Sequence, residues 1–383
     1  MVASQKETGG MKIGIDARMI NASGIGRYTK NLLIELQRLD KDNQYFIFLL
    51  PADFEKLKFS ANFQKVLADF KWYGLDEQRK FPPILKKYNL DLLHVPHFNI
   101  PLMYPGKIVV TVHDMIHFDF KTRQASTHNL FVYELKYAIY KKVFQSALKK
   151  SQKIMTVSNF VKNELETRWQ VKEKKIVVTA EAVEENLIKL SQKNDKNQSQ
   201  KVLDKFGIKP PYIFYVGNAH PHKNVKRLIA AFKILRQNYQ YLQLVLSGAE
   251  SPFWREIQRQ IQDDNNIKYT GFISDEELVG LYKNAQVYVF PSLSEGFGIP
   301  LLEAMACGCP VASSDRTSLP EVGGEAAIYF DPENIEDMVV KIKKILDDQK
   351  LRKDLILKGQ ERVKEFSFKK MAEQTLKVYQ ESI

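Results

Sequence analysis

The chain has 383 residues, of which 44% are hydrophobic and 27% are charged, and its formal net charge is +12. This length exceeds one ordinary core and suits two domains of about 150–200 residues each. The composition is that of a soluble globular protein, no apolar run reaches the roughly 20 residues of a membrane span, and residues 1–10 lack the apolar core of a secretory signal.

Short apolar strands alternate with helical segments in the first half of the chain. A glycine-containing loop and a helix through Leu32 and Leu36 follow the first strand. Continuous apolar strands separated by helices are typical of a parallel sheet covered on both faces. We therefore predict an α/β, Rossmann-like domain over residues 1–182. Its strands are expected at Lys12–Asp16, Tyr45–Leu50, Asp91–Val95, Ile108–Val112, Ile154–Val157 and Ile176–Thr179.

The pattern restarts after a polar stretch. Residues 183–209 include the run SQKNDKNQSQ and are predicted to be a linker. A second Rossmann-like domain is predicted over 210–365, followed by a terminal helix over 366–383. Two S-x-x-E sequences, Ser274–Glu277 and Ser318–Glu321, predict helices that begin with capping boxes. The expected strands are Tyr212–Val216, Leu242–Leu246, Ile267–Tyr269, Val287–Phe290 and Val311–Ser313.

The segment Pro291–Glu303, PSLSEGFGIPLLE, links a predicted strand to a helix that we expect to open at Pro300. The amides of Gly296, Phe297 and Gly298 are then free to bind a ligand beyond the carboxyl end of the strand. Glu295 lies in the loop and Glu303 in the first turn, so both carboxylates can accept hydrogen bonds from the hydroxyls of a sugar or ribose. For Glu303 alone, stabilisation of the helix dipole is the simpler alternative.

Three further strand ends carry candidate functional residues. Gly217–Asn224, GNAHPHKN, places Lys223 beside a helix start, which suits a diphosphate. Gly24–Tyr28, GIGRY, supplies Gly24 and Gly26 but lacks the full GxGxxG spacing, and a tight turn explains it equally well. His113 ends the strand Ile108–Val112, where a structural role is the alternative to a functional one.

We predict that the protein holds no metal. The pairs His94/His97, His113/His117 and His220/His222 lack the helical spacing and acidic partner of known metal motifs. Asp40–Lys41–Asp42 has the D-x-D form but is interpreted as a turn. The two cysteines, Cys307 and Cys309, are interpreted as small buried residues, and their number favours a reducing compartment.

The positive charge is concentrated in the first half of the chain. A basic, aromatic-rich helical segment there suits an anionic membrane surface, although a solvated helix face over a core is the alternative. Its lysines are Lys136, Lys141, Lys142, Lys149, Lys150 and Lys153, and the apolar residues between them include Phe131, Tyr133, Leu135, Tyr137, Ile139, Tyr140, Val143 and Phe144.

Taken together, these segments resemble glycosyltransferase family 4, the retaining enzymes of the GT-B fold, over nearly the whole chain from Met11. The E-x7-E sequence from Glu295 to Glu303 matches the signature of that family. Other similar segments are GIGRY, TVHD, TVSNF, YVGNAHPHKN, YTGFISDEELVGLY, EAMACGCPV and SLPEV. The resemblance implies two Rossmann-like domains with parallel sheets facing across a cleft, and a last helix that returns to the N-terminal domain.

The same resemblance implies a role for each matching residue. His113 and Glu295 would be catalytic, with His113 contacting the sugar from the N-terminal domain. Lys223 would neutralise the diphosphate, Glu303 would bind the ribose, and Phe272 would lie near the base. Many members carry Arg where this chain has His222. The donor-binding set would be Gly24, Gly26, Asn218, Lys223, Phe272, Gly296, Phe297, Gly298 and Glu303.

We therefore expect a metal-independent, retaining hexosyltransferase that needs no cofactor, because the nucleotide-sugar is a co-substrate. Similarity to the mannosyltransferase-like branch favours GDP-mannose, with UDP-glucose, UDP-galactose and UDP-N-acetylglucosamine as alternatives. The acceptor would be a glycan or a lipid-linked precursor of a polysaccharide. We expect a cytoplasmic protein, with peripheral attachment to the inner face of the membrane as an option, and no nucleic-acid partner.

Two rival classes make different predictions. A nicotinamide-dependent dehydrogenase would carry GxGxxG after its first strand, which this chain lacks. A non-enzymatic polyanion-binding protein would account for the positive charge but would leave Glu295 and Glu303 unexplained.

Overall fold

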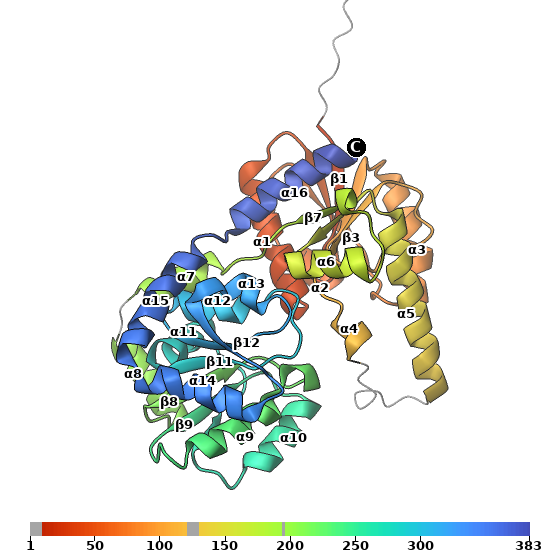
Figure 1. Ribbon diagram of the computed structural model, residues 1–383. Coiled ribbons are helices and arrows are strands. Elements are labelled where there is room, and N and C mark those ends of the chain that lie inside the picture. The colour runs from red at the N-terminus through yellow and green to blue at the C-terminus, as the bar shows by residue number, and fades with distance from the viewer. Residues whose placement is uncertain (1–9, 121–129, 194–195) are drawn as a thin grey trace, which may run out of the picture. The chain divides into compact units, whose positions relative to one another are not determined.

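The computed structural model describes residues 10–120, 130–193 and 196–383. The chain forms two compact units (Figure 1). The first comprises Met1–His113, Arg123–Ala180 and Phe368–Ile383, and the second comprises Asp114–Thr122 and Glu181–Ser367. The interpretation of residues 1–9 as lacking a secretory signal lies outside the described residues. None of the helices in the described ranges combines the length and the apolar character that a bilayer span requires.

The first unit is built on a sheet of seven parallel strands in the order β3-β2-β1-β4-β5-β6-β7. Its central strands are buried along nearly their whole length, as expected for a sheet covered on both faces. The strands are β1 Lys12–Asp16, β2 Gln44–Leu49, β3 Phe63–Leu67, β4 Leu92–Val95, β5 Ile108–Val112, β6 Lys153–Thr156 and β7 Ile176–Val178.

Helices cover this sheet, and the last helix of the chain is one of them. Apolar residues of α16 recur every three or four positions and are buried. The α16 helix packs against α1 (Figure 1), and the hydroxyl of Tyr379 is hydrogen-bonded to Nδ1 of His94 at 2.7 Å. The helices of the first unit are α1 Ser23–Leu39, α2 Pro51–Lys56, α3 Leu75–Lys87, α5 Leu130–Lys150, α6 Asn159–Thr167 and α16 Phe368–Ser382, with the 3-10 turn η2 Glu173–Lys175.

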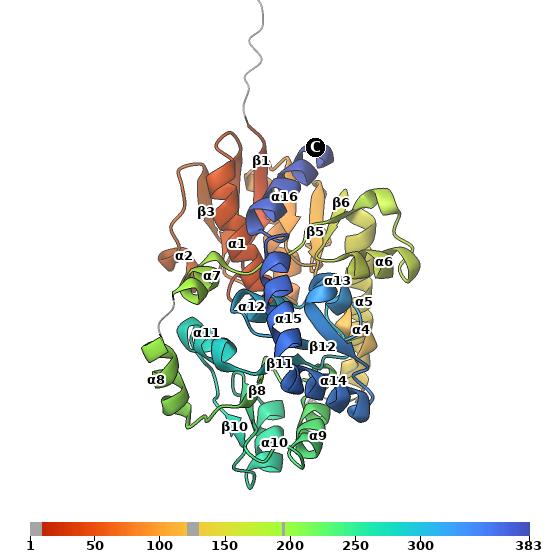
Figure 2. The same ribbon diagram turned by 60° about the vertical axis from the view of Figure 1, so that its left-hand side comes forward.

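The second unit contains a sheet of six parallel strands in the order β10-β9-β8-β11-β12-β13. Helix α14 packs on β11, β12 and β13, while α15 packs on α12 (Figure 2). The strands are β8 Tyr212–Val216, β9 Gln243–Ser247, β10 Ile267–Tyr269, β11 Val287–Phe290, β12 Val311–Ser314 and β13 Ala327–Phe330. The helices are α4 Ile116–Asp119, α7 Glu185–Gln192, α8 Lys196–Phe206, α9 Val225–Leu235, α10 Pro252–Ile261, α11 Asp275–Asn284, α12 Ile299–Ala306, α13 Leu319–Gly323, α14 Ile335–Asp347 and α15 Gln349–Val363, with the turns η3 Pro221–Lys223 and η4 Gly324–Ala326.

The structure differs from the sequence interpretation in two places. Residues 183–209, expected to be a linker, form helices α7 and α8 on either side of the undescribed residues 194–195, and both helices pack on α11. The strands β3 and β13 were not predicted. Both lie at sheet edges and are only partly buried, and polar Gln64 and Lys65 interrupt the apolar pattern of β3, whereas the apolar sequence AIYF of β13 was overlooked.

Each sheet reverses its winding between two central neighbours, β1 and β4 in the first unit and β8 and β11 in the second. At such a switch point, the loops at the carboxyl ends of the two strands diverge and leave room for a ligand. A ligand site is therefore expected in the loops that follow these four strands.

Candidate functional site

The loops after β8 and β11 are joined at the switch point of the second unit. The backbone N–H of Leu293 donates to the carbonyl oxygen of His222 at 2.7 Å. The side chain of Asn224, which is buried, donates to the carbonyl oxygen of Pro291 at 3.0 Å and to that of Pro332 at 2.7 Å. The two segments that the sequence predicts as binding loops are thus one connected structure.

A charged pair lies between these loops. Nζ of Lys223, in the turn η3, is 2.6 Å from Oε1 of Glu295, and the two side chains are only 16% and 9% exposed. A pair this poorly solvated is held by stronger attraction than a surface ion pair. The structure therefore brings together the predicted phosphate-binding cation and one of the predicted carboxylates.

Hydrogen bonds from the segment after β12 support the glycine-rich loop around Glu295. The hydroxyl of Ser318 donates to the carbonyl oxygens of Glu295 and Phe297, each at 3.0 Å, and the backbone N–H of Glu295 donates to Oγ1 of Thr317 at 3.0 Å. Gly298 has φ 102°, and a Cβ there would lie 2.6 Å from Leu319. Only glycine fits this position without strain.

The capping-box prediction holds at one of the two positions. Ser274 and Glu277 form a complete capping box at the start of α11. Ser318 precedes α13 as predicted but does not cap it, because its backbone is in the right-handed helical conformation and not in the extended one that an N-cap adopts. Its hydroxyl donates instead to the loop carbonyls of Glu295 and Phe297, so the helix start is confirmed and the second capping box is wrong.

Two helices begin at this site, and neither has a side-chain cap. The residue before α9 is Asn224, whose side-chain oxygen accepts from the side chain of Arg227 and not from a first-turn backbone N–H, and the residue before α12 is Gly298, which has no side chain. Both residues are in the left-handed conformation. First-turn amides without a side-chain cap can donate to an anion, and the helix dipole adds to the attraction. In α12 this leaves the N–H of Ile299, because Pro300 has no N–H and that of Leu301 donates to the carbonyl oxygen of Gly298. Together with the ammonium of Lys223, these amides give the site one end at which an anion is favoured.

Glu303 lies deeper in α12 than the sequence predicts. The helix begins at Ile299 rather than at Pro300, so its first turn contains no acidic residue and Glu303 is in the second turn, 3% exposed. Because the dipole effect is confined to the first turn, it does not explain a buried carboxylate here. Burial, then Tyr215, Glu303 and Glu295, raise the pKa of Tyr288 well above its ordinary value, so both carboxylates act on one buried hydroxyl.

The histidines of the β8 loop are neutral at pH 7. Burial, followed by the charge of Lys223, lowers the pKa of His222 to about 3, and the same two causes lower the pKa of His220. Many members of the resembled family carry an arginine at the position of His222. The histidine of this chain can offer a neutral N–H there but no positive charge. The side-chain oxygen of Asn218 accepts from the N–H of His220 at 3.2 Å.

Two other predicted donor contacts differ in burial. Phe272, after the edge strand β10, is 80% exposed, whereas Phe297 is buried with its ring centroid 5.6 Å from that of Phe366. Phe297 therefore presents its backbone and not its ring to a ligand. Gly296 lies between Glu295 and Phe297 in the same loop.

Of the predicted residues of the first unit, His113 lies at a strand end, whereas Gly24 and Gly26 lie in helix α1 and not in a loop before it. His113 follows β5, where its Nε2 is 3.1 Å from the carbonyl oxygen of Pro96 and its ring packs edge-on against Tyr28. Gly26 is buried in α1, and a Cβ there would lie 2.4 Å from the carbonyl oxygen of Ile20. Gly24 has open space around it. Because any larger side chain at position 26 would clash with the backbone of residue 20, packing alone explains the glycine there.

The cysteines and the D-x-D sequence are accounted for by the structure. Cys307 and Cys309 are buried, and burial raises the pKa of Cys307 to about 12, which makes the thiol unreactive at neutral pH. Oδ1 of Asp40 accepts from the N–H of Asp42 at 3.0 Å, as expected for a turn. Across the described ranges, no group of three or more His, Cys, Asp or Glu is arranged to hold a metal ion.

Three residues of the site were missed by sequence reasoning, namely Asn224, Thr317 and Ser318. Each acts through a hydrogen bond to the backbone of a distant loop. Asn224 was within a predicted segment, and its left-handed conformation at a helix start is a role that asparagine accepts more readily than most residues. In the sequence, Ser318 carried only a helix-start signal and Thr317 carried none.

Comparisons with known proteins cover most of the chain. Residues 22–186 match the family model Glycosyltransferase Family 4, and residues 191–362 match the model Glycosyl transferases group 1. The chain is 30% identical to O-antigen chain mannosyltransferase B of Escherichia coli, over 80% of this chain and 78% of that protein. It is 26% identical to O-antigen chain mannosyltransferase RfbU of Salmonella typhimurium, over 85% and 88%. A glycosyltransferase structure from Rickettsia africae matches with a TM-score of 0.76 at 20% identity, covering 97% and 98% of the two chains.

Proposed function

Because the chain belongs to the glycosyltransferases of family 4 and group 1, we propose that it transfers mannose from GDP-mannose to a hydroxyl of a glycan or lipid-linked acceptor, with retention of configuration. The observation that carries the proposal is the Lys223–Glu295 pair between two uncapped helix starts. One end of this arrangement suits a diphosphate and the other suits sugar hydroxyls.

In the proposed reaction, the bond between the anomeric carbon and the leaving phosphate oxygen breaks as negative charge builds on the phosphate. Lys223 and the amides at the starts of α9 and α12 stabilise that charge in a poorly solvated site, which is usually the largest catalytic contribution. Glu295 accepts hydrogen bonds from the transferred sugar, and Glu303 accepts them from the ribose.

The acceptor hydroxyl attacks the anomeric carbon from the face that the phosphate leaves. A new carbon–oxygen bond forms on that face, so the configuration is retained, and the acceptor proton moves to the departing phosphate oxygen. His113 contacts the sugar from the first unit, and Gly24 brings a backbone amide to the donor. The backbone N–H of Gly26 donates to the carbonyl oxygen of Ala22 at the start of α1, so this amide is not available to the donor. The charge of the diphosphate is balanced without a metal ion.

The donor assignment rests on the two relatives that are named as O-antigen mannosyltransferases. A UDP-sugar is the alternative donor. The names of the same relatives support a polysaccharide precursor as the acceptor. The exposed apolar residues Leu135 and Ile139 on α5, among its lysines, support peripheral attachment to the inner, anionic face of a membrane. The side chains of Phe131 and Tyr133, part of the same prediction, lie outside the described residues.

Thermal unfolding in the presence of candidate ligands tests the donor. We expect GDP-mannose to raise the melting temperature more than UDP-glucose, UDP-galactose, UDP-N-acetylglucosamine, NAD or an oligonucleotide, because only a ligand that binds the folded state stabilises it. A larger rise in melting temperature with a UDP-sugar would identify that sugar nucleotide, and not GDP-mannose, as the donor. Stabilisation by the oligonucleotide alone would favour a polyanion-binding protein instead.

A further inference from the structure

The loop of Glu295 is anchored by the ring of Phe297. This ring is buried, and its centroid lies 5.6 Å from that of Phe366, with the two ring planes at 81°. Edge-to-face packing of this kind fixes the relative direction of both rings. Phe366 follows the end of α15 and stands two positions before Phe368, at which the chain enters the first unit. The loop is therefore in contact with residues 364–367, which we call the crossing segment.

The guanidinium of Arg362, in the last turn of α15, packs on the other aromatic partner of this contact. Its central carbon lies 5.0 Å from the centroid of the Phe366 ring, within the range of a cation–π interaction. Nε of Arg362 donates to the carbonyl oxygen of Val322 at 2.9 Å, and Nη2 donates to that of Glu321 at 2.5 Å. Nη1 pairs with the exposed carboxylate of Glu365. Because every nitrogen of the guanidinium has a partner, its plane is held in one orientation.

The two carbonyl groups that Arg362 binds belong to the end of α13. The last carbonyl groups of a helix have no partner within it, and an arginine side chain can supply one. A helix of five residues is not stable alone, so contacts of this kind decide where it lies. Before the other end of α13, the hydroxyl of Ser318 donates to the carbonyl oxygens of Glu295 and Phe297. Helix α13 therefore connects Arg362 to the loop of Glu295.

These contacts form a closed circuit. It runs from the ring of Phe297 through that of Phe366 to the guanidinium of Arg362. It continues along α13 to Ser318 and returns to the carbonyl oxygen of Phe297. Within such a circuit the loop cannot shift unless several contacts change together, because close-packed interiors yield little.

The backbone beside the circuit is strained at Thr317. This residue has φ 56°, an unfavourable conformation for a β-branched side chain. Its Oγ1 accepts from the backbone N–H of Glu295 at 3.0 Å. Strain of this kind persists only where the surroundings hold it, and it is common at functional sites. The circuit thus keeps Thr317, and with it Glu295, in place.

Helix α15 also packs closely on α12, the helix that carries Glu303 (Figure 2). A Cβ at Gly359 of α15 would lie 3.0 Å from Cγ of Met305 in α12. At this separation a shift of one helix is passed on to the other. Both the loop of Glu295 and the helix of Glu303 are therefore in contact with α15 or with the crossing segment that follows it.

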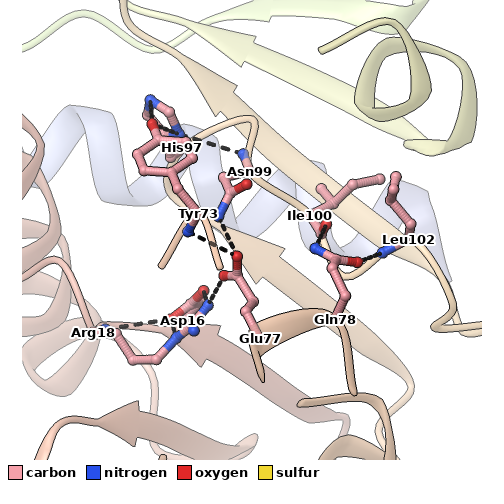
Figure 3. A network of polar contacts seen from close by, with 9 residues as sticks. All are labelled: Asp16, Arg18, Tyr73, Glu77, Gln78, His97, Asn99, Ile100 and Leu102. Atoms are coloured by element: carbon pink, nitrogen blue, oxygen red, sulfur yellow. Dashed lines mark hydrogen bonds and ion pairs between the residues drawn. The ribbon is translucent and has the colours of Figure 1, made fainter. Parts of the chain in front are cut away.

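The partners of Arg362 differ from those of the buried Arg18 in the first unit, whose network Figure 3 shows. Nε of Arg18 donates to Oδ1 of Asp16 at 2.8 Å, and Nη2 is 2.6 Å from Oε1 of Glu77. Both of these partners are carboxylates of side chains. Two bonds of Arg362 end instead on backbone oxygens, so its position depends on that of α13 itself.

We propose that Arg362 and Phe366 are positioning residues for the sugar part of the donor, because they hold the loop that presents Glu295. The inference rests on the proposed function, in which this carboxylate binds the transferred sugar. It adds that the sugar is linked to the crossing segment, through which the chain leaves the second unit. Such a link is reciprocal, so a bound sugar also orders the crossing segment.

Calorimetric titration of the full-length protein with GDP-mannose and with GDP tests the positioning role. Phe366→Ala removes the ring that contacts Phe297, so the ratio of the Kd for GDP-mannose to that for GDP should rise at least about 5-fold. Arg362→Lys keeps the charge but loses the planar fork, and it should raise the same ratio at least about 3-fold. Phe366→Tyr keeps the ring and should restore the wild-type ratio.

Leu355→Ala is the matched control for lost stability. Leu355 is a buried residue of α15 in the hydrophobic core of the second unit. Its truncation should lower the melting temperature at least as much as Phe366→Ala does and leave the ratio of the two Kd values unchanged. An unchanged ratio in Phe366→Ala as well would show that Phe366 serves stability alone, and would overturn the inference.

Hydrogen exchange followed by mass spectrometry measures the link to the crossing segment. In the wild-type protein, saturating GDP-mannose should slow exchange in peptides that cover residues 360–367 at least about 3-fold more than saturating GDP does. In Phe366→Ala, saturated with the same ligands, this difference should disappear. Equal protection by the two ligands in the wild type would overturn the link between sugar and crossing segment.

The two proposals can be told apart by these measurements. If thermal unfolding identifies a UDP-sugar as the donor, that sugar nucleotide and UDP take the places of GDP-mannose and GDP. Binding of a nucleotide-sugar by the wild type, with a Kd ratio that ignores Phe366, would remove only the positioning role. Absence of binding by every nucleotide-sugar would overturn the proposed function and the positioning role with it.

Discussion

Lys223 and Glu295 lie 72 positions apart in the sequence, yet the ammonium of one is 2.6 Å from the carboxylate of the other. Each therefore serves as the counter-ion of its partner in the structure. A diphosphate that binds between the two helix starts competes with Glu295 for the ammonium, and sugar hydroxyls can then replace Lys223 on the carboxylate. Under the proposed function, the pair would therefore couple recognition of the two parts of a nucleotide-sugar.

We predict that Lys223→Ala and Glu295→Ala each lower kcat/KM for transfer at least about 100-fold, or about 2.7 kcal/mol. Each change leaves one charge of a poorly solvated pair without a partner and removes a ligand contact. The matched control is Lys226→Ala, which breaks the exposed pair with Glu256 and should change kcat/KM less than about 2-fold. Rates like those of the wild type in both site variants would remove these residues from the site.

Ser318→Ala should loosen the loop that presents Glu295. The hydroxyl supports two buried carbonyl oxygens, so its loss should cost about 1–3 kcal/mol of unfolding free energy and raise KM for the donor about 10-fold. Ser274→Ala removes the cap of α11 and should cost about 1 kcal/mol without changing KM. Equal KM values in the two variants would show that the Ser318 contacts serve only stability.

Acid should destabilise the protein through its buried histidines. Burial, followed by His113, lowers the pKa of His94 from 6.5 to about 3, and burial followed by Lys223 does the same for His222. Such a histidine gains its proton on unfolding, so stability is full above pH 6.5 and falls as the pH drops toward 3. The expected slope is about 1.4 kcal/mol per pH unit for each histidine.

Urea unfolding at pH 7, 6, 5 and 4 measures this slope. In His94→Gln, which has no titrating group at position 94, the slope should be smaller than in the wild type by the contribution of one histidine. In the native state, Nδ1 of His94 lies 2.7 Å from the Tyr379 hydroxyl and Nε2 lies 3.0 Å from the Thr111 hydroxyl, and a neutral ring accepts at one nitrogen and donates from the other. Identical slopes for the two proteins would mean that His94 is already protonated in the folded state.

Chelation should leave transfer intact. We expect EDTA to change the rate less than about 2-fold, because Lys223 and the amides at two helix starts supply the charge that stabilises the leaving phosphate. The control is a metal-dependent transferase assayed in the same buffer. Loss of activity that manganese restores would contradict the metal-free mechanism.

The basic helix α5 should bind anionic vesicles. Flotation with vesicles of phosphatidylglycerol and phosphatidylcholine at low salt should carry the protein upward, and pure phosphatidylcholine should not. The double variant Leu135→Glu, Ile139→Glu places charge on two exposed apolar positions and should abolish flotation. Absence of the wild-type protein from the floated fraction would count against attachment through α5.

The sequence was sufficient for the parts of the fold and site that depend on local patterns. Strands such as β5 and β11 are unbroken apolar runs, and their loops contain glycine and charged residues at recognisable spacings. The family signature from Glu295 to Glu303 then predicts a glycosyltransferase, which the relatives confirm.

What the sequence could not predict depends on long-range contacts. The pairing of Lys223 with Glu295, the support of Glu295 by Ser318, and the network around Arg18 each join separate loops. Glu77 reads as an ordinary acidic residue in the first turn of α3, yet it is fully buried against Arg18. Such burial of a charge follows from tertiary packing and leaves no periodic signal.

The placement of α16 in the first unit has a consequence for engineering and for evolution. Apart from Asp114–Thr122, the second unit runs without a break from Glu181 to Ser367, and the chain then returns to the first unit at Phe368. A single cut or fusion point therefore cannot deliver an intact half, because it would leave His94 and its neighbours without Tyr379. A chimera that exchanges the Glu181–Ser367 part of the second unit between relatives has to be spliced at two junctions, near 180 and near 367.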